Sequence, residues 1–303
     1  MSDNWTTTKI SSQEGKTILI TGANSGLGLE AAKILSTKGA KVIMAVRNLD
    51  KGNQAAKTIL SEYPNAQVDV MQLDLADLES VRKFADEFKS KYTQLHILIN
   101  NAGVMWPPRR ESTKQGFESQ FGINHLGHFA LTGYLLDMLK NTPNSRIVNQ
   151  SSLAHTMISK LNFDDLNWEK SYNKNKAYAQ SKLANLLFTY ELDRKLKESG
   201  NGCISVACHP GVTATNLFRS SNSLVNWGSG LIGQRVEIGT LPMLRAATEE
   251  DLKGGEYYGP KGFMGMSGYP KIVRSTQTSH NIELARKLWQ LSEQLTQVKY
   301  NFD

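Results

Sequence analysis

Short apolar runs alternate with segments of helical periodicity along the first half of the chain, and this alternation limits the fold more than any other feature. Segments 26–38, 50–62 and 77–91 have the apolar spacing of amphipathic helices. A strand, a helix and a second strand in sequence require a right-handed crossover and a parallel sheet. The sequence therefore predicts a doubly wound α/β domain. The runs expected to be buried strands are residues 17–21, 41–46, 67–73, 95–100, 146–150 and 203–208.

The rest of the chain is expected to belong to the same domain, since no Pro-, Gly- or Ser-rich linker and no repeat interrupts it. We expect residues 1–14 to form a polar tail and residues 15–303 to form the domain. Residues 218–233 are too polar and broken for a core element, which suggests a C-terminal substrate lid. Further helices are expected at residues 116–140, 176–198 and 281–295, with a polar loop at 153–175.

Charge and composition favour a cytoplasmic enzyme with a small-molecule partner. The net charge of +7 is spread along the chain with acidic residues nearby, so we expect no nucleic-acid partner. Cys203 and Cys208 lie in one short apolar run and are expected to be unbonded core residues. No window of 18 apolar residues occurs, so no transmembrane segment is expected, and residues 1–14 lack the apolar stretch of a secretion signal.

A glycine-rich turn follows the first expected strand and opens the first expected helix. It reads Thr21-Gly22-Ala23-Asn24-Ser25-Gly26-Leu27-Gly28, with the spacing G-x-x-x-G-x-G. Glycines let the backbone approach a ligand, and the free N–H groups at a helix N-terminus attract a pyrophosphate. Turns need glycine for other reasons too, but the strand before and the helix after favour a dinucleotide site.

The end of the second expected strand bears on which dinucleotide is bound. NAD-binding units usually carry an acid there, which holds the ribose 2′-hydroxyl. This chain has Arg47 instead, whose guanidinium suits a 2′-phosphate, and Ser25 can be a second donor. NADP(H) is therefore the expected cofactor. The alternative, a solvent-facing arginine at a strand end, would leave the preference open.

Tyr178 and Lys182 lie four residues apart in an expected helix and therefore project from one face. A free phenol has a pKa near ~10, and a neighbouring ammonium could lower that pKa. Ser152 follows an expected strand at the carboxyl edge of the sheet, where ligands of open α/β sheets bind. The alternative interpretation is a Tyr-Lys pair on the protein surface with no catalytic role. The pair therefore indicates an active site only in combination with the other motifs.

Taken together, these motifs resemble the short-chain dehydrogenase/reductase family over residues 16–215, and all occur in the family's order. Segments 146–155 and 181–185 are similar to the retinol dehydrogenase-like branch, which acts on retinoids and other lipophilic aldehydes or ketones. The polar residues 1–14 differ from the membrane anchor of many animal members, which puts retinoid metabolism in a bilayer in doubt. The resemblance rests on the glycine turn, Asp74, Asn100-Asn101-Ala102-Gly103, Asn124, Ser152, Tyr178-Ala179-Gln180-Ser181-Lys182 and His209-Pro210-Gly211.

The resemblance implies a Rossmann-type oxidoreductase that interconverts a carbonyl compound and its alcohol by hydride transfer. With NADP(H) as the expected cofactor, reduction is the expected direction, because NADPH is mostly reduced in cells. The resemblance also implies Tyr178 as the proton donor, Lys182 as the cation that lowers its pKa and binds the nicotinamide ribose, and Ser152 as the group that polarises the carbonyl. Asn124 would anchor a water that links Lys182 to solvent. From the motifs and the resemblance together, the expected cofactor-binding residues are Gly22, Asn24, Ser25, Gly26, Leu27, Gly28, Arg47, Asp74, Leu75, Asn101, Ala102, Gly103, Tyr178, Lys182, Pro210, Gly211, Val212, Thr213 and Thr215.

Several alternatives stay open at this stage. Ser151 could replace Ser152, and Asn124 could be a capping residue. His125 and His128 are three apart but lack a third expected ligand, so no metal is expected, because hydride chemistry belongs to the nicotinamide. A non-catalytic NADP(H)-sensing protein, an enoyl reductase and a sugar-nucleotide epimerase share parts of the pattern. The family resemblance also makes a homodimer an expectation.

Overall fold

An eight-stranded sheet runs through the computed structural model, which describes residues 4–212 and 234–302. The strand order is β3-β2-β1-β4-β5-β6-β7-β8, and every neighbouring pair is parallel except β7 and β8. This confirms the expected α/β fold with a mainly parallel sheet. The strands are β1 Thr17–Thr21, β2 Lys41–Val46, β3 Gln67–Gln72, β4 Ile97–Asn100, β5 Arg146–Gln150, β6 Ile204–Cys208, β7 Tyr257–Pro260 and β8 Pro270–Ile272.

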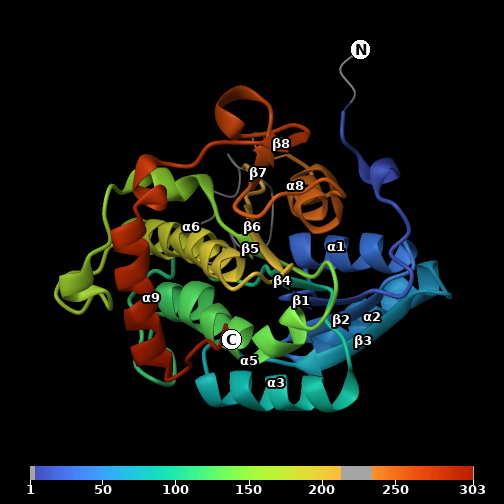
Figure 1. Ribbon diagram of the computed structural model, residues 1–303, viewed down its shortest axis with the longest axis horizontal. Coiled ribbons are helices and arrows are strands. Elements are labelled where there is room, and N and C mark those ends of the chain that lie inside the picture. The colour runs from blue at the N-terminus through green and yellow to red at the C-terminus, as the bar shows by residue number, and fades with distance from the viewer. Residues whose placement is uncertain (1–3, 213–233, 303) are drawn as a thin grey trace.

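Helices cover both faces of the sheet, as Figure 1 shows for α1 and α8 on one side and α3 and α5 on the other. In β1, Ile18 and Ile20 join the core under α1, α2 and α8, whereas Leu19 joins the core under α3 and α5. The inner strands β1, β2, β4, β5 and β6 are buried on both faces, which explains their largely apolar sequences, whereas β3 and β8 at the two edges are partly exposed. The longer helices are α1 Gly26–Thr37, α2 Leu49–Glu62, α3 Leu78–Lys91, α5 Gly127–Lys140, α6 Lys174–Glu198, α8 Val236–Thr248 and α9 Ile282–Thr296.

Local sequence accounts for where these helices begin. Asn48 caps α2 by accepting a hydrogen bond from the Lys51 N–H at 2.9 Å, and Asp77 caps α3 in the same way. The helix expected at 116–140 is interrupted instead. It begins as the short α4, Ser119–Phe121, and passes through a π-helical segment, Gly122–Leu126, before α5. Such π segments often occur at functional sites.

Residues 4–14 are packed onto the domain, whereas the sequence predicts a polar tail for residues 1–14. Trp5 and Ile10 are only 5% and 4% exposed and lie in the core beside α1. The Ile10 carbonyl accepts a hydrogen bond from Lys38 Nζ at 3.0 Å. Two buried apolar side chains among polar neighbours are enough to fix this segment, although the average composition is that of a tail.

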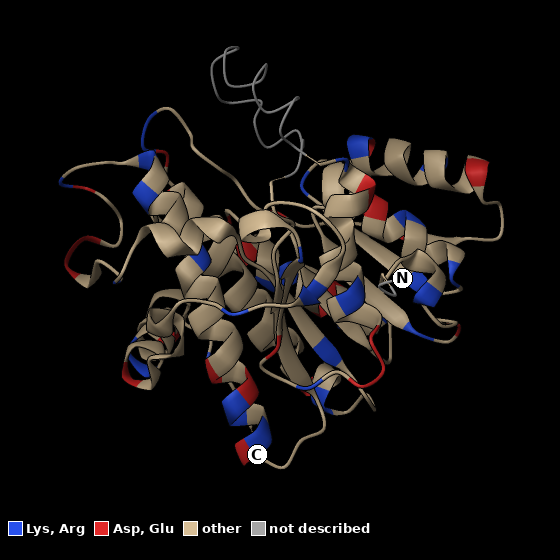
Figure 2. Ribbon diagram, turned by 90° about the horizontal axis from the view of Figure 1, so that it is seen from above, with Lys and Arg blue, Asp and Glu red and all other residues tan. Residues whose placement is uncertain are grey.

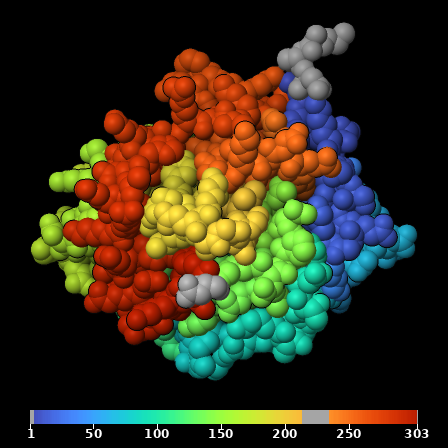
Figure 3. Space-filling model, in the orientation of Figure 1, coloured from blue at the N-terminus to red at the C-terminus, as the bar shows by residue number. Residues whose placement is uncertain are grey.

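The last helix, α9, packs against α5 and α6 on the side of the sheet away from α1. Figure 3 shows the C-terminal residues, in red, lying against α6 in yellow and α5 in green. Trp289 of α9 packs against Phe129 and Phe188 with ring centroids 5.2 and 5.8 Å apart. This aromatic cluster fixes α6, the helix that carries Tyr178, from its outer side.

The remaining expectations concern cysteines, charge and membrane spans. Cys203 and Cys208 are buried and free, as expected. Lysines and arginines are interspersed with acidic residues along the helices in Figure 2. Among the described residues, no helix is both long enough and apolar enough to cross a membrane.

Candidate active site

A cleft of about 1300 Å³ opens over the carboxyl ends of the parallel strands, where the strand order reverses between β1 and β4. Ligands of open α/β sheets bind at this position. The structure brings together nearly all of the expected site residues here. Those that line the cleft are Gly22, Asn24, Ser25, Gly26, Leu27, Gly28, Arg47, Asp74, Leu75, Asn101, Ala102, Gly103, Ser152, Tyr178, Lys182, Pro210, Gly211 and Val212.

The glycine turn between β1 and α1 has no room for larger side chains. Gly22 has a φ of +68°, which side chains rarely allow. A Cβ at Gly28 would lie 2.5 Å from the Gly22 carbonyl oxygen and 2.6 Å from Asn101 Nδ2. Ser25, the residue before α1, makes no capping hydrogen bond with its side chain. The turn therefore presents backbone and a hydroxyl toward the cleft, as a pyrophosphate site requires.

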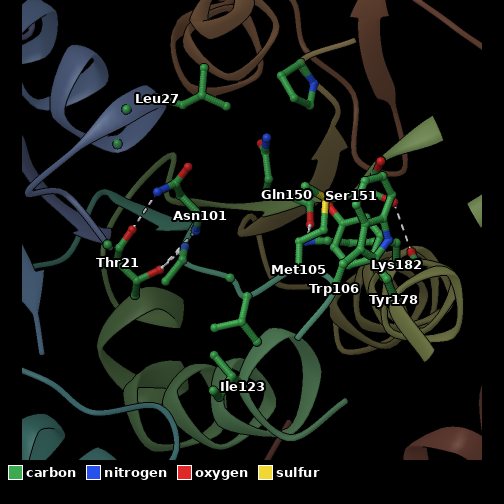
Figure 4. Close-up of a pocket in the computed structure, with 18 of the residues that line it drawn as sticks. Thr21, Leu27, Asn101, Met105, Trp106, Ile123, Gln150, Ser151, Tyr178 and Lys182 are labelled. Atoms are coloured by element: carbon green, nitrogen blue, oxygen red, sulfur yellow. Dashed lines mark hydrogen bonds between the residues drawn. The ribbon is translucent and has the colours of Figure 1, made fainter. Parts of the chain in front are cut away.

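Thr21 and Asn101 join the ends of β1 and β4 across the point where the strand order reverses. Thr21 Oγ1 accepts hydrogen bonds from the N–H groups of Asn101 and Ala102 at 3.0 and 2.9 Å. Asn101 Nδ2 donates to the Thr21 carbonyl at 2.8 Å. Figure 4 shows these bonds at one end of the pocket, with Tyr178 and Lys182 at the other. They hold the two halves of the cleft floor in a fixed relation.

Two cations lie where β2 meets α2. Arg47 directly follows β2, is exposed and lines the cleft, and no acid occupies its position. Lys51, in the first turn of α2, lines the same end of the cleft. Lys51 belongs to no motif of the sequence and was not among the expected site residues. The sequence signal that could have identified Lys51 is its spacing of four residues from Arg47. Both side chains reach the cleft because α2 begins at Leu49, between the two residues.

Asp74 and Leu75 form the side of the cleft beyond β3. Asp74 Oδ1 accepts a hydrogen bond from the Ala76 N–H at 2.9 Å, and the Asp74 N–H donates to Ser80 Oγ at 3.0 Å. The acid thus stabilises its own turn as well as facing the cleft. Leu75 is 7% exposed and packs beneath α5, where a Cβ on Gly127 would lie 2.6 Å from its carbonyl oxygen.

Tyr178 and Lys182 project from α6 into the cleft beside Ser152. Tyr178 is 8% exposed and Lys182 is 3% exposed. Lys182 Nζ lies 5.6 Å from the centroid of the Tyr178 ring and donates to the Gln150 carbonyl at 3.1 Å. The Tyr178 phenol, the Ser152 hydroxyl and the Lys182 ammonium therefore lie together at the carboxyl end of β5. This set of hydrogen-bond donors suits a carbonyl oxygen.

The pKa of Tyr178 differs from the sequence-based expectation. Burial raises it to about 12, and hydrogen bonding with Ser152 only partly opposes this. Burial also lowers the pKa of Lys182 to about 8. The ammonium faces the Gln150 carbonyl, so desolvation of the phenol outweighs any lowering of its pKa by Lys182. At neutral pH both groups hold their protons.

The two adjacent serines have different partners. Ser151 is 2% exposed, and its Oγ donates to the Lys182 carbonyl at 2.9 Å. Ser152 lines the cleft and interacts with the Tyr178 phenol, while its Oγ also accepts from the Ala154 N–H at 3.2 Å. The geometry therefore favours Ser152 as the group that meets a substrate, and Ser151 as a support for α6.

Asn124 lies behind the cleft in the π-helical segment. Its Oδ1 accepts from the Val104 N–H at 2.8 Å, and its Nδ2 donates to the Val104 carbonyl and to Ser181 Oγ, both at 3.0 Å. Its carboxamide therefore ties the loop after β4 to α6. The expected water link between Asn124 and Lys182 stays a prediction. The side chains of both residues lie close to Gly103.

His125 and His128 are buried and contact different partners. His125 Nε2 lies 2.9 Å from Ser292 Oγ, and His128 Nε2 lies 2.8 Å from Thr21 Oγ1. Burial lowers their pKa values to about 3 and about 4, so both stay neutral. Within residues 4–212 and 234–302 no group of three or more His, Cys, Asp or Glu could hold a metal ion.

The end of the cleft beside Leu153, which the 263–266 turn adjoins, is lined by methionine side chains. Met157 and Met264 are 58% and 69% exposed at its rim. Gly211 has a φ of +69°, and the Val212 N–H donates to the Met266 carbonyl at 2.8 Å, which holds the 263–266 turn against this end. The expected site residues Thr213 and Thr215, and the expected lid at 218–233, lie outside the described residues.

Comparison with known proteins decides the family. The family model described as short chain dehydrogenase matches residues 16–225. The chain belongs to this family. Short-chain dehydrogenases are oxidoreductases that use NAD(H) or NADP(H) with small-molecule substrates. The resemblance drawn from the glycine turn and the Tyr178 motif is thus confirmed.

Individual relatives are similar over almost the whole chain. This short-chain dehydrogenase is 41% identical to retinol dehydrogenase 12 of Mus musculus, over 94% of this chain and 88% of that protein. It is also 41% identical to the chloroplastic short-chain dehydrogenase TIC 32 B of Brassica napus, over 92% and 88%. A crystal structure of an uncharacterized protein from Mycobacterium paratuberculosis has a TM-score of 0.81 and 41% identity, covering 98% and 99%. The chain is thus related to retinol dehydrogenases, with no substrate fixed by similarity.

Proposed function

We propose that this short-chain dehydrogenase is an NADP(H)-dependent reductase of lipophilic aldehydes or ketones. The observation that carries the proposal is the placement of the Tyr178 phenol beside the Ser152 hydroxyl, inside the cleft and one helical turn from Lys182. A substrate carbonyl oxygen that reaches this point can accept hydrogen bonds from both hydroxyl groups. These bonds strengthen as negative charge develops on that oxygen.

The protonation state of Tyr178 suits a proton donor. Burial raises the pKa of Tyr178 to about 12, so the phenol keeps its proton at neutral pH. The phenol can therefore give its proton to the substrate oxygen during reduction. The nicotinamide, when bound, supplies the hydride that reaches the carbonyl carbon. Lys182, with a pKa of about 8, keeps a proton and a positive charge beside the phenol.

The cleft fits a dinucleotide phosphate in shape and charge. A Cβ at Gly28 would fill the space against Gly22 and Asn101, so the closely approached backbone suits a pyrophosphate. Arg47 and Lys51 would hold a 2′-phosphate, with the guanidinium able to donate two parallel hydrogen bonds. Because no acid replaces Arg47 after β2, we propose NADP(H) as the preferred cofactor.

The methionine-lined end of the cleft supports a lipophilic substrate. Methionine side chains adapt to irregular apolar ligands, and Met157, Met264 and Met266 all line this end. A long hydrocarbon group could lie along them while its carbonyl reaches Tyr178. The similarity to retinol dehydrogenase 12 is consistent with this class of substrate.

The test is a panel of aldehydes and ketones of increasing chain length, followed at the nicotinamide absorbance with NADPH and with NADH. We expect NADPH-dependent reduction, with kcat/KM rising as the hydrocarbon chain lengthens. Binding of NADPH without turnover of any compound would instead favour a non-catalytic NADP(H)-sensing protein. Consumption of NADPH only with conjugated enones, giving the saturated ketone, would favour an enoyl reductase.

A further inference from the structure

Trp106 has a backbone conformation that a bulky residue rarely adopts. Its φ is +57°, in the left-handed region, and it lies in the loop that leads from the Asn101–Gly103 turn to the substrate end of the cleft. Outliers of this kind persist only when the surrounding structure holds them, and they gather at functional sites. The contacts of Trp106 therefore merit a functional explanation.

Gln120 holds the Trp106 backbone in place. Gln120 is fully buried, and its Oε1 accepts a hydrogen bond from the Trp106 N–H at 2.9 Å. Its Nε2 donates to the Tyr172 hydroxyl at 3.2 Å and to the Lys174 carbonyl at 3.1 Å. The Tyr172 hydroxyl in turn donates to the Pro107 carbonyl at 3.4 Å. One carboxamide thus fixes the Trp106 loop to the start of α6.

This attachment sets the Trp106 indole against the phenol of Tyr178. The two rings meet edge to face, with centroids 6.2 Å apart and planes at 73°. Figure 4 shows Trp106 beside Tyr178 at one end of the pocket. Because Gln120 bonds to the backbone of Lys174, only four residues before Tyr178, the loop and the helix keep one relative position.

The position of the indole bears on which substrates fit. A carbonyl carbon has two substituents, and both must be accommodated when its oxygen contacts Tyr178 and Ser152. The methionine-lined end with Met264 and Met266 can take the larger one. The other substituent then lies beside the Trp106 indole, because this indole lines the cleft next to the Tyr178 ring.

We propose that Trp106 determines specificity by limiting the size of the smaller substituent on the reacting carbonyl, and that Gln120 is its positioning residue. This inference rests on the proposed function. It predicts that aldehydes and methyl ketones are reduced efficiently, whereas ketones with two large substituents are poor substrates.

The test compares two substrates of equal carbon number, a linear aldehyde and a ketone whose carbonyl lies mid-chain. Trp106→Ala should raise the ratio of ketone to aldehyde kcat/KM by at least about tenfold, the lower bound of what a single methylene group changes in an apolar pocket. The gain should appear mainly as a lower KM for the ketone. Trp106→Phe keeps an aromatic wall and should shift the ratio less.

Gln120→Leu tests the positioning role, because leucine cannot accept the Trp106 N–H. Its ratio should shift in the same direction as that of Trp106→Ala. The matched control is Gln180→Leu, which removes a similarly buried carboxamide that bridges the Asn162 N–H and the Leu166 carbonyl. The control should leave the ratio at the wild-type value, even where it costs a similar amount of stability.

The outcomes distinguish failure of the specificity role of Trp106 from failure of the proposed function. If the wild-type protein reduces aldehydes but Trp106→Ala leaves the ratio unchanged, the specificity role is overturned and the proposed function stands. If the wild-type protein reduces no carbonyl compound, both are overturned. A shift in Gln180→Leu as large as in Gln120→Leu would show general loosening of α6 and would overturn the positioning role.

Discussion

Replacing Tyr178 with phenylalanine removes one oxygen atom from the centre of the cleft and leaves the ring in place. The ring packs against Trp106 at 6.2 Å, a contact that phenylalanine can keep. The hydroxyl interacts with Ser152 and is buried, with a pKa raised to about 12. The substitution therefore tests proton donation with little change in packing.

The expected losses in rate and in stability differ widely. Loss of a positioned proton donor lowers kcat by about 100- to 10,000-fold, and 100-fold corresponds to about 2.7 kcal/mol in the activation barrier. The hydroxyl of Tyr178 is already desolvated and interacts with one side chain, so its removal should change the free energy of unfolding by no more than about 1 kcal/mol. The variant should thus be folded and nearly inactive.

The chain offers a matched control in Tyr190, which is three turns further along α6. Its hydroxyl lies 2.7 Å from Ser275 Oγ, and burial raises its pKa to about 12 as well, but it does not line the cleft. Tyr190→Phe should keep wild-type kcat.

The assay is the initial rate of aldehyde reduction with saturating NADPH, alongside thermal unfolding of each variant. A Tyr178→Phe variant that kept more than a tenth of wild-type kcat would refute the role of the phenol. Equal losses in Tyr178→Phe and Tyr190→Phe would assign the effect to helix packing.

Three further predictions concern the cofactor and the buried lysine. Arg47→Ala and Lys51→Ala should each raise KM for NADPH about tenfold with little effect on KM for NADH. Rising salt should reduce the difference in NADPH KM between each variant and the wild type. Equal effects on both cofactors would exclude a 2′-phosphate contact. Gly28→Ala should weaken NADPH binding at least about tenfold in a fluorescence titration, because its Cβ would meet the Gly22 carbonyl at 2.5 Å; unaltered affinity would contradict the close approach. Lys182 loses its proton near pH 8 when folded and near 10.5 when unfolded, so between these pH values the unfolded chain binds more protons and stability rises with pH. Relative to Lys182→Met, the free energy of unfolding should gain up to about 3 kcal/mol across this window, and denaturant titrations that give a flat difference would contradict the lowered pKa.

Most of the sheet could be predicted from sequence because its inner strands are buried on both faces and are therefore apolar. The expected strands at 17–21, 41–46 and 146–150 agree with β1, β2 and β5, and the other three differ by one or two residues at an end. β7 was missed because its sequence Tyr-Tyr-Gly-Pro contains two residues that usually break strands. α8 was missed because Pro242 lies in its interior.

The candidate site also contains residues that the sequence could predict and residues that it could not. Residues on motifs of fixed spacing, such as Gly28 and Tyr178, could be placed in the cleft from the sequence alone. The Gln120 bridge could not, because its partners Trp106 and Lys174 are 14 and 54 residues away. The pKa of Tyr178 was also mispredicted, since the cost of burying a phenol depends on the whole surrounding structure.

The reversal of strand order between β1 and β4 has a consequence for how the protein is made. The glycine turn and Arg47 belong to the first 50 residues, whereas Ser152, Tyr178 and Lys182 are translated more than 100 residues later. A nascent chain that has emerged only as far as β3 holds one wall of the cleft and no opposite wall. Protection of ribosome-bound chains by NADPH against proteolysis should therefore begin only after α6 has left the exit tunnel.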